Sequence, residues 1–210
     1  EFWAYFGIVL TCSMLIAFNI RNMYSNFGEA LRHSAFQVAS YMSTTGYATA
    51  NTNLWPGFSK AILILLMFVG GCAGSTAGGL KLSRLMLLIK TARNRINRVV
   101  HPRTVKAVRF EEKSMDEEAI SGVLTYFTIY IFCILALFLV LSLEGFSFET
   151  NFTAAVSTFN NVGPIFGDLG YFGEYSAFSK LVMCFNMLVG RLEIFPMLLL
   201  LTPRSWKRYN

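Results

Sequence analysis

An internal repeat constrains the fold of this sequence more than any other feature. At a shift of 120 residues, the stretch 58–71 ("FSKAILILLMFVGG") matches 178–191 ("FSKLVMCFNMLVGR"). At a shift of 117 residues, 39–46 ("ASYMSTTG") matches 156–163 ("VSTFNNVG"). The matches follow one another in the same order along the chain. The sequence therefore predicts two tandem copies of one structural unit.

The apolar segments of the chain approach the length needed to cross a membrane. Hydrophobic residues make up 54% of the sequence and charged residues only 14%, whereas a soluble domain carries about 25% charged residues. A membrane-spanning helix needs about 20 apolar residues. The sequence therefore predicts an all-α integral membrane protein in contact with lipid. The four candidate spans are Phe2–Ile20, Phe58–Val69, Ile120–Leu143 and Phe178–Leu201.

Basic residues are concentrated in two places. Ten of the 18 lysines and arginines lie in the segment 81–113, and three more lie between Arg204 and Arg208. Each cluster follows an apolar segment, as the positive-inside rule expects of cytoplasmic loops. We therefore expect 81–113 and the C-terminus on the cytoplasmic side, and no nucleic acid as a partner. The segment 90–113 either orients the chain on anionic lipid or docks an acidic cytosolic regulator, and the sequence does not distinguish these.

Two shorter stretches of moderate hydrophobicity lie in the loops predicted on the outer side. They are 29–42 ("EALRHSAFQVASYM") and 149–159 ("ETNFTAAVSTF"), and each opens with a glutamate and runs into a polar segment that contains glycine. An acidic residue stabilises a helix N-terminus, and the opposite end of the helix carries a partial negative charge. Two re-entrant helices would therefore point cation-attracting ends at mid-membrane. Two amphipathic helices on the outer surface are the alternative.

The polar segments after these stretches are "STTGY" at 43–47 and "NNVGP" at 160–164. Irregular backbone at membrane depth must be buried in protein or line a water-filled cavity, and glycine permits backbone angles closed to other residues. We therefore expect each segment to present a row of carbonyl groups to an ion path. Two copies cannot surround an ion with four-fold symmetry. Either two chains pair, or two further repeats precede Glu1, where the chain opens in an apolar run.

Four motifs in this order resemble the Trk/Ktr/HKT superfamily of potassium transporters, most closely its TrkH branch. "STTGY" and "NNVGP" are similar to the filters of the third and fourth repeats of that family. "GGCAGSTAGGLKLSR" at 70–84 resembles the loop that interrupts the third repeat's second span, and "GRLEIFP" at 190–196 resembles the arginine motif of the last span. The resemblance covers essentially the whole chain. One departure is Ile165, where a second glycine is usual, so we expect a differently shaped outer mouth.

This resemblance implies an architecture. Residues 1–90 would form the third span–pore-loop–span repeat, 91–118 a cytoplasmic basic connector, and 119–210 the fourth repeat with a cytoplasmic tail. The two repeats would form half of a pseudo-four-fold, potassium-channel-like pore in the bacterial inner membrane. A homodimer and a cytosolic nucleotide-binding ring of the TrkA type are the implied partners.

The resemblance also implies potassium uptake through a filter of backbone carbonyl groups, with potassium as the substrate and no cofactor in this chain. A sodium-permeable or mixed-cation transporter of the same fold is the alternative, and serine in place of a filter glycine would favour it. A non-conducting structural subunit would not need two glycine filters. The implied filter residues are Thr44, Thr45, Gly46, Tyr47, Asn161, Val162 and Gly163.

A gate is expected below this filter. The segment 70–79 holds five glycines and no bulky apolar side chain, so it cannot form a lipid-facing helix; a packing kink is the alternative. Arg191 lies within a span, where a charge costs about 2.5–3.5 kcal/mol on insertion scales. It either faces the pore as a fixed cation or pairs with Glu193. Arg191 and Glu193 are the only ionisable groups clearly inside a span, which argues against an intramembrane enzyme. The predicted gating residues are Gly70, Gly71, Gly74, Ser75, Thr76, Gly78, Gly79 and Arg191.

Overall fold

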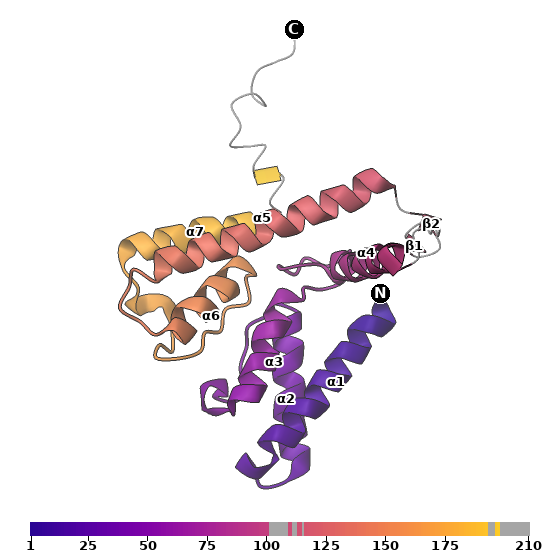
Figure 1. The fold of residues 1–210 in the computed structure, drawn as a ribbon. Coiled ribbons are helices and arrows are strands. Elements are labelled where there is room, and N and C mark those ends of the chain that lie inside the picture. The colour runs from indigo at the N-terminus through magenta and orange to yellow at the C-terminus, as the bar shows by residue number, and fades with distance from the viewer. Residues whose placement is uncertain (101–108, 111–112, 115, 193–195, 198–210) are drawn as a thin grey trace.

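The computed structural model of the protein describes residues 1–100, 109–110, 113–114, 116–192 and 196–197. Figure 1 shows a mostly helical chain, as the sequence predicts; the strands in the described part are the two-residue pair β1 and β2. The helices are α1 (Phe2–Ile20), α2 (Phe27–Met42), α3 (Gly57–Phe68), α4 (Leu82–Val100), α5 (Glu117–Leu141), α6 (Phe148–Phe159) and α7 (Ala177–Arg191). Short 3-10 helices are η1 (Arg21–Met23), η2 (Thr52–Leu54) and η3 (Phe172–Glu174), and the strands are β1 (Arg109–Phe110) and β2 (Lys113–Ser114).

Helices α1–α3 and α5–α7 follow the same order, which is a long apolar helix and then two shorter helices. In Figure 1 each set of three lies together as one half of the molecule. Similar hydrogen bonds hold the third helix of each half to the end of the first: Ser59 Oγ donates over 2.7 Å to Asn19 Oδ1 in the last turn of α1, and Ser179 Oγ donates over 2.6 Å to Glu144 Oε1 just after α5. Hydrogen bonds from Ser176 and Ser179 lower the pKa of Glu144. Because Ser59 and Ser179 are equivalent in the sequence repeat, each half is stabilised internally by a similar hydrogen bond.

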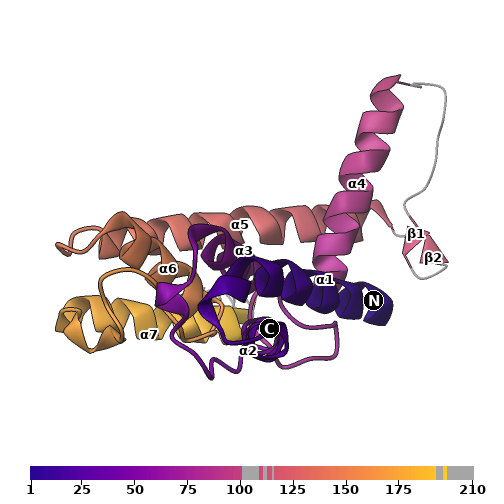
Figure 2. The same cartoon turned by 90° about the horizontal axis from the view of Figure 1, so that it is seen from below.

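The first part of the basic segment is helical, where a loop was expected. Helix α4 runs across residue 90, the expected domain boundary, and it stands at a steep angle to α1 and α5 (Figure 2). Leu82, Leu87 and Thr91 are buried, the last two of them one turn apart, whereas Arg93 and Arg95 are exposed. This spacing is typical of an amphipathic helix. The density of basic residues obscured it in the sequence.

Two segments of the described chain are long and apolar enough to cross a membrane, Phe2–Met23 and Glu118–Leu141. They correspond to the first and third predicted spans. Helix α3 has only 12 residues and ends at Phe68, because the glycine-rich segment follows. Helix α7 has 15 residues and ends at Arg191, and most of the fourth predicted span beyond it lies outside the described residues.

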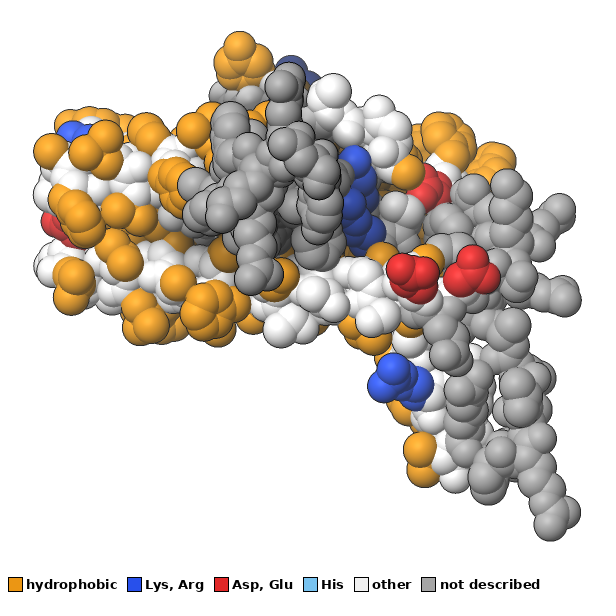
Figure 3. Space-filling model, turned by 90° about the horizontal axis from the view of Figure 1, so that it is seen from above, with side chains coloured by type: hydrophobic (Ala, Val, Ile, Leu, Met, Phe, Trp, Pro, Cys, Tyr) orange, Lys and Arg blue, Asp and Glu red, His pale blue; other side chains and the backbone are white. Residues whose placement is uncertain are grey.

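Large apolar side chains on the long helices face outward. Helix α1 has 19 residues and buries four of them, and Trp3 at its start is 82% exposed. On α5, Phe132 is 71% exposed. Figure 3 shows hydrophobic side chains spread over one face of the molecule, with few charged ones among them. Soluble monomers seldom expose large contiguous apolar surfaces, so lipid is the environment that these helices fit.

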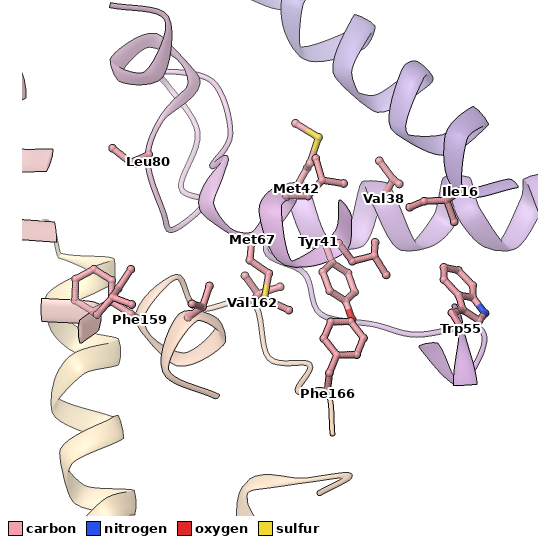
Figure 4. Packing of buried hydrophobic residues seen from close by; sticks show 14 of the residues in the cluster. Ile16, Val38, Tyr41, Met42, Trp55, Met67, Leu80, Phe159, Val162 and Phe166 are labelled. Carbon is pink, nitrogen blue, oxygen red and sulfur yellow. The ribbon is translucent and has the colours of Figure 1, made fainter. Parts of the chain in front are cut away.

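The main hydrophobic core lies between the two halves. Tyr41 of α2 stacks on Phe166, which follows α6, with ring centroids 6.1 Å apart. Both side chains are fully buried. Figure 4 shows the two rings pointing toward each other, with Met67 of α3 and Val162 in the same cluster. This packing holds the segments that follow α2 and α6 against one another.

An ion pair adds a polar contact between the halves. Lys60 Nζ of α3 lies 2.6 Å from Glu149 Oε1 in the first turn of α6. The side chains of Lys60 and Glu149 are 19% and 42% exposed. The pair is a contact that the sequence did not predict, although both residues stood at repeated positions.

We expect a double-mutant cycle of Lys60→Met and Glu149→Gln to give a coupling of about 0.5–1 kcal/mol in the free energy of unfolding, since exposed ion pairs reach that range. Unfolding is measured on purified protein in detergent micelles. A cycle of Lys180→Met and Glu149→Gln is the control, because Lys180 Nζ donates to the Gly173 carbonyl instead. Equal coupling in the two cycles would contradict a specific contribution from this pair.

Candidate functional site

The short helices α2 and α6 end directly before the two glycine segments. At the other end, Asn26 Oδ1 accepts from the Glu29 N–H over 2.9 Å, and Ser147 Oγ accepts from the Thr150 N–H over 3.4 Å. These caps satisfy donors that a helix N-terminus leaves open. The C-terminal ends at Met42 and Phe159 carry the negative end of each macrodipole. Both glycine segments therefore lie where a cation is favoured.

The backbone of the two glycine segments enters the left-handed region at matching positions. The φ angles are +55° at Thr44 and +77° at Gly46, and +56° at Asn161 and +109° at Gly163. Thr44 matches Asn161 and Gly46 matches Gly163 at the same repeat shift. Residues other than glycine seldom adopt such backbone angles. The two segments therefore share one backbone pattern, in which left-handed residues alternate with others.

Serines at equivalent positions close the two segments. The backbone N–H groups of Thr45 and Val162 donate to the carbonyls of Ser40 and Ser157, over 3.0 Å and 2.9 Å. Ser40 Oγ donates to the Tyr47 carbonyl over 2.7 Å, and Ser157 Oγ accepts from the Gly163 N–H over 2.9 Å. The two serines match at the repeat shift of 117 residues, but the sequence alone predicted no role for them. Their polarity inside two apolar helices was the available signal.

The two glycine segments touch each other. A Cβ built on Gly46 would overlap the Val162 carbonyl, and one built on Gly163 would lie 3.9 Å from Gly46 Cα. A cavity of about 260 Å³ opens beside them. The predicted filter residues that line it are Thr44, Thr45, Asn161, Val162 and Gly163, together with Ser157, Thr158, Phe172, Lys180, Met183, Cys184 and Met187. Gly46 and Tyr47 are outside this lining.

Ile165, the departure from the family pattern, points into the protein. It is 8% exposed and belongs to a second core cluster that contains Leu137, Ala154 and Met183. Its side chain therefore packs against the helices of the second half.

The predicted gate is a loop whose two ends are joined by hydrogen bonds. Its last residues contact the glycine segments. At its base, the Leu80 N–H donates to the Phe68 carbonyl over 3.2 Å and the Leu82 N–H donates to the Gly71 carbonyl over 3.0 Å. Near its end, the Gly78 N–H donates to Thr44 Oγ1 over 3.4 Å. A Cβ on Gly78 would overlap the Asn160 carbonyl. Glycine is therefore required where this loop meets the second glycine segment.

Arg191 lies beside the predicted gate. It is the exposed last residue of α7, and a cavity of about 60 Å³ brings it together with Ser75, Thr76 and Gly79. Gly74 has no atom within 4 Å of a built Cβ, so it lies apart from these contacts. Glu193, the alternative ion-pair partner of Arg191, lies outside the described residues. The other residues of the predicted gate, Gly70, Gly71 and Gly78, lie toward the ends of the loop.

A buried hydrogen bond connects α5 to the second glycine segment, next to Gly79 of the predicted gate. Tyr130 Oη donates to Asn160 Oδ1 over 2.6 Å, and Asn160 Nδ2 donates to the Val156 carbonyl over 2.9 Å. Tyr130 and Asn160 have no exposed surface. A Cβ on Gly79 would lie 3.1 Å from Asn160 Oδ1. No sequence pattern indicates this network, because Tyr130 lies inside an apolar span.

Tyr130→Phe is expected to lower the free energy of unfolding by about 1–3 kcal/mol, because Asn160 Oδ1 is left buried without its donor. Denaturation of the purified protein in micelles measures this loss. Tyr171→Phe is the matched control, since Tyr171 is 63% exposed. Equal stability of the two variants would mean that the hydrogen bond contributes nothing net.

Known proteins match almost the entire chain. The TrkH family model, described as cation transport protein, matches residues 9–208. The Trk system potassium uptake protein TrkH of Salmonella typhimurium is 34% identical over 212 residues, which cover 99% of this chain and 44% of that protein. TrkH of Escherichia coli K12 is 34% identical over 203 residues, which cover 96% of this chain and 42% of that protein.

A solved structure gives the same result. The crystal structure of the potassium transporter TrkH from Vibrio parahaemolyticus matches with a TM-score of 0.91 at 32% sequence identity, covering 99% of this chain and 45% of that one. The chain thus spans less than half the length of these relatives. The family model covers nearly every residue, and the fold agrees with it. The chain therefore belongs to the TrkH family of cation transport proteins.

Proposed function

We propose that this chain forms part of a potassium-selective uptake pathway across the bacterial inner membrane. The observation that carries the proposal is the matched left-handed backbone at Thr44 and Gly46 and at Asn161 and Gly163, placed at the C-terminal ends of α2 and α6. Rows of carbonyl oxygens can replace the hydration shell of potassium. The carbonyl groups of 44–47 and 161–163 are the proposed ligands. The relatives named above are potassium uptake proteins and transporters, which supports this substrate.

We infer that two further repeats complete a pseudo-four-fold pore around these loops. Lys60 and Glu149 supply a pattern for the contact between one repeat and the next. Lys180 of α7 matches Lys60 in the sequence repeat, and Glu29 of α2, like Glu149 of α6, is the acidic residue in the first turn of its helix. Each is suited to an oppositely charged residue on a neighbouring repeat. The completed unit would pair as a homodimer and bind a cytosolic nucleotide-binding ring of the TrkA type.

The charges of the chain support one orientation in this pathway. The segment 81–113, which includes α4, and the C-terminal tail carry most of the basic residues. Cytoplasmic loops are enriched in such residues. We therefore assign both segments to the cytoplasmic side and the starts of α2 and α6 to the outer side.

The loop 70–79 and Arg191 form the proposed gate on the inner side of the filter. The loop contacts the filter segments through Gly78, and Ser75 and Thr76 share a cavity with Arg191. Mobile loops that close a pathway need few apolar contacts of their own. A small, polar and glycine-rich loop meets that requirement.

Deleting Ala73–Ala77 is expected to raise potassium flux at low driving force and to leave ion preference unchanged. The deletion removes residues beside Arg191, whereas the filter segments keep their own hydrogen bonds. Rubidium uptake by purified protein in liposomes measures the flux. Gly74→Ala is the control, because a Cβ there meets no neighbouring atom. If the shortened protein folds and conducts at the original rate, the loop has only a packing role and is not a gate.

Ion uptake into liposomes tests the function as a whole. The complete protein, with this chain and the two further repeats, is reconstituted, and potassium or sodium is supplied as an outside-to-inside gradient, one at a time. The proposal expects uptake of potassium well above that of sodium. Equal uptake of the two ions would indicate a mixed-cation transporter, and uptake of neither would overturn the proposal.

A further inference from the structure

Asn53 joins the two halves beside the proposed filter. It lies in η2, between the first glycine segment and α3. Its side-chain amide pairs with both backbone groups of one residue in the other half. Asn53 Nδ2 donates to the Gly167 carbonyl over 3.0 Å, and the Gly167 N–H donates to Asn53 Oδ1 over 2.9 Å. A carboxylate could make only the second of these bonds, because it has no donor.

Gly167 is also held on its other side. Its φ is +104°, and a Cβ there would overlap Thr150 Oγ1 of α6. Thr150 Oγ1 accepts from the Asp168 N–H over 2.8 Å, and Asp168 Oδ2 accepts from the Ser147 N–H over 3.0 Å. Hydrogen bonding by Ser147 lowers the pKa of Asp168. Gly167 is thus clamped between the start of α6 and Asn53.

The link from Gly167 back to the filter is short and stiff. Three residues separate it from Gly163, and the first of them is Pro164, whose ring fixes φ. The Phe166 N–H donates to Thr153 Oγ1 over 3.0 Å, and the Phe166 side chain is fully buried. A displacement of Gly167 is therefore transmitted to the filter instead of being absorbed by a loose loop.

We propose that Asn53 is a positioning residue for ion selectivity. By clamping Gly167, it sets the position of the glycine segment of the second half relative to that of the first half. This inference rests on the proposed function of the two segments as an ion filter. In this proposal Asn53 acts through Gly167, whose two backbone groups its side-chain amide holds by hydrogen bonds.

Two substitutions at Asn53 separate its donor from its size. Asn53→Asp keeps the shape and the acceptor, loses the donor, and places an oxygen against the Gly167 carbonyl. Asn53→Ala removes both hydrogen bonds. Asn22→Asp and Asn22→Ala are the matched controls, because Asn22 is an exposed asparagine in η1. Potassium and sodium uptake are measured in liposomes, each normalised to the amount of monodisperse protein.

We expect both Asn53 variants to lower the ratio of potassium to sodium uptake by about fivefold, equivalent to roughly 1 kcal/mol, with the Asn22 variants unchanged. An unchanged ratio in folded Asn53 variants would overturn the inference. Failure of Asn53→Asp to fold, where Asn22→Asp folds, would also overturn it in favour of a purely structural contact. If the unmodified protein itself does not prefer potassium, the proposed function fails first, and this outcome is distinct from the other two.

Discussion

Gly46→Ser is expected to reduce the ratio of potassium to sodium uptake by about tenfold or more, because tenfold corresponds to only ~1.4 kcal/mol. Two costs act together at this position. The φ angle of +77° is unfavourable for serine, by about 1–2 kcal/mol. The new Cβ would also overlap the Val162 carbonyl of the other half. Relief of the overlap has to move proposed ion ligands in both segments.

Gly163→Ser separates these two costs. Its φ of +109° is also left-handed, but a Cβ there has its nearest neighbour at 3.9 Å. We therefore expect a smaller loss of selectivity at Gly163 than at Gly46. Gly57→Ser is the control for adding a hydroxymethyl group, because no atom lies within 4 Å of a Cβ at Gly57. If Gly46→Ser and Gly57→Ser show equal potassium selectivity, the assignment of 43–47 to the filter is rejected.

The sequence predicted the family and the helical fold because these depend on patterns that repeat. Two features can be recognised from the sequence alone: the match between 58–71 and 178–191, and the four motifs in their order. The family assignment that rests on them is confirmed. The same alignment paired Gly46 with Gly163, and both carry positive φ angles in the structure. The assignment of those glycines to an ion filter stays a prediction.

The contacts between the halves could not be predicted because they join residues that no local pattern connects. Asn53 and Gly167 are 114 positions apart, and Lys60 and Glu149 are 89 apart. Each residue alone reads as an ordinary loop or helix-end residue. Helix α4 was missed for another reason, since a count of basic residues hides the spacing of the apolar ones. Tertiary partners and amphipathic spacing therefore account for most of what the sequence left open.

Arg191→Gln is expected to raise potassium flux about tenfold. A positive charge about 4 Å from a cation costs roughly 4 kcal/mol at an effective dielectric constant of 20. Arg191 is exposed beside a polar cavity, so screening by water is expected to leave about a third of this energy, and ~1.4 kcal/mol is a tenfold change in rate. Glutamine keeps much of the volume and the hydrogen bonding but removes the charge. Rubidium uptake in liposomes measures the rate.

Pairing of Arg191 with Glu193 gives the opposite expectation for the same variant. Loss of the arginine would then leave a carboxylate unpaired in the membrane, which lowers expression and flux together. Arg32→Gln, the same change at an exposed arginine of α2, controls for loss of charge elsewhere. Faster flux with normal expression in Arg191→Gln alone would favour the barrier, since a structural ion pair has no means of slowing a folded protein. Poor expression with slower flux would reject the barrier, because removing a repulsive charge from the pathway cannot itself slow a cation.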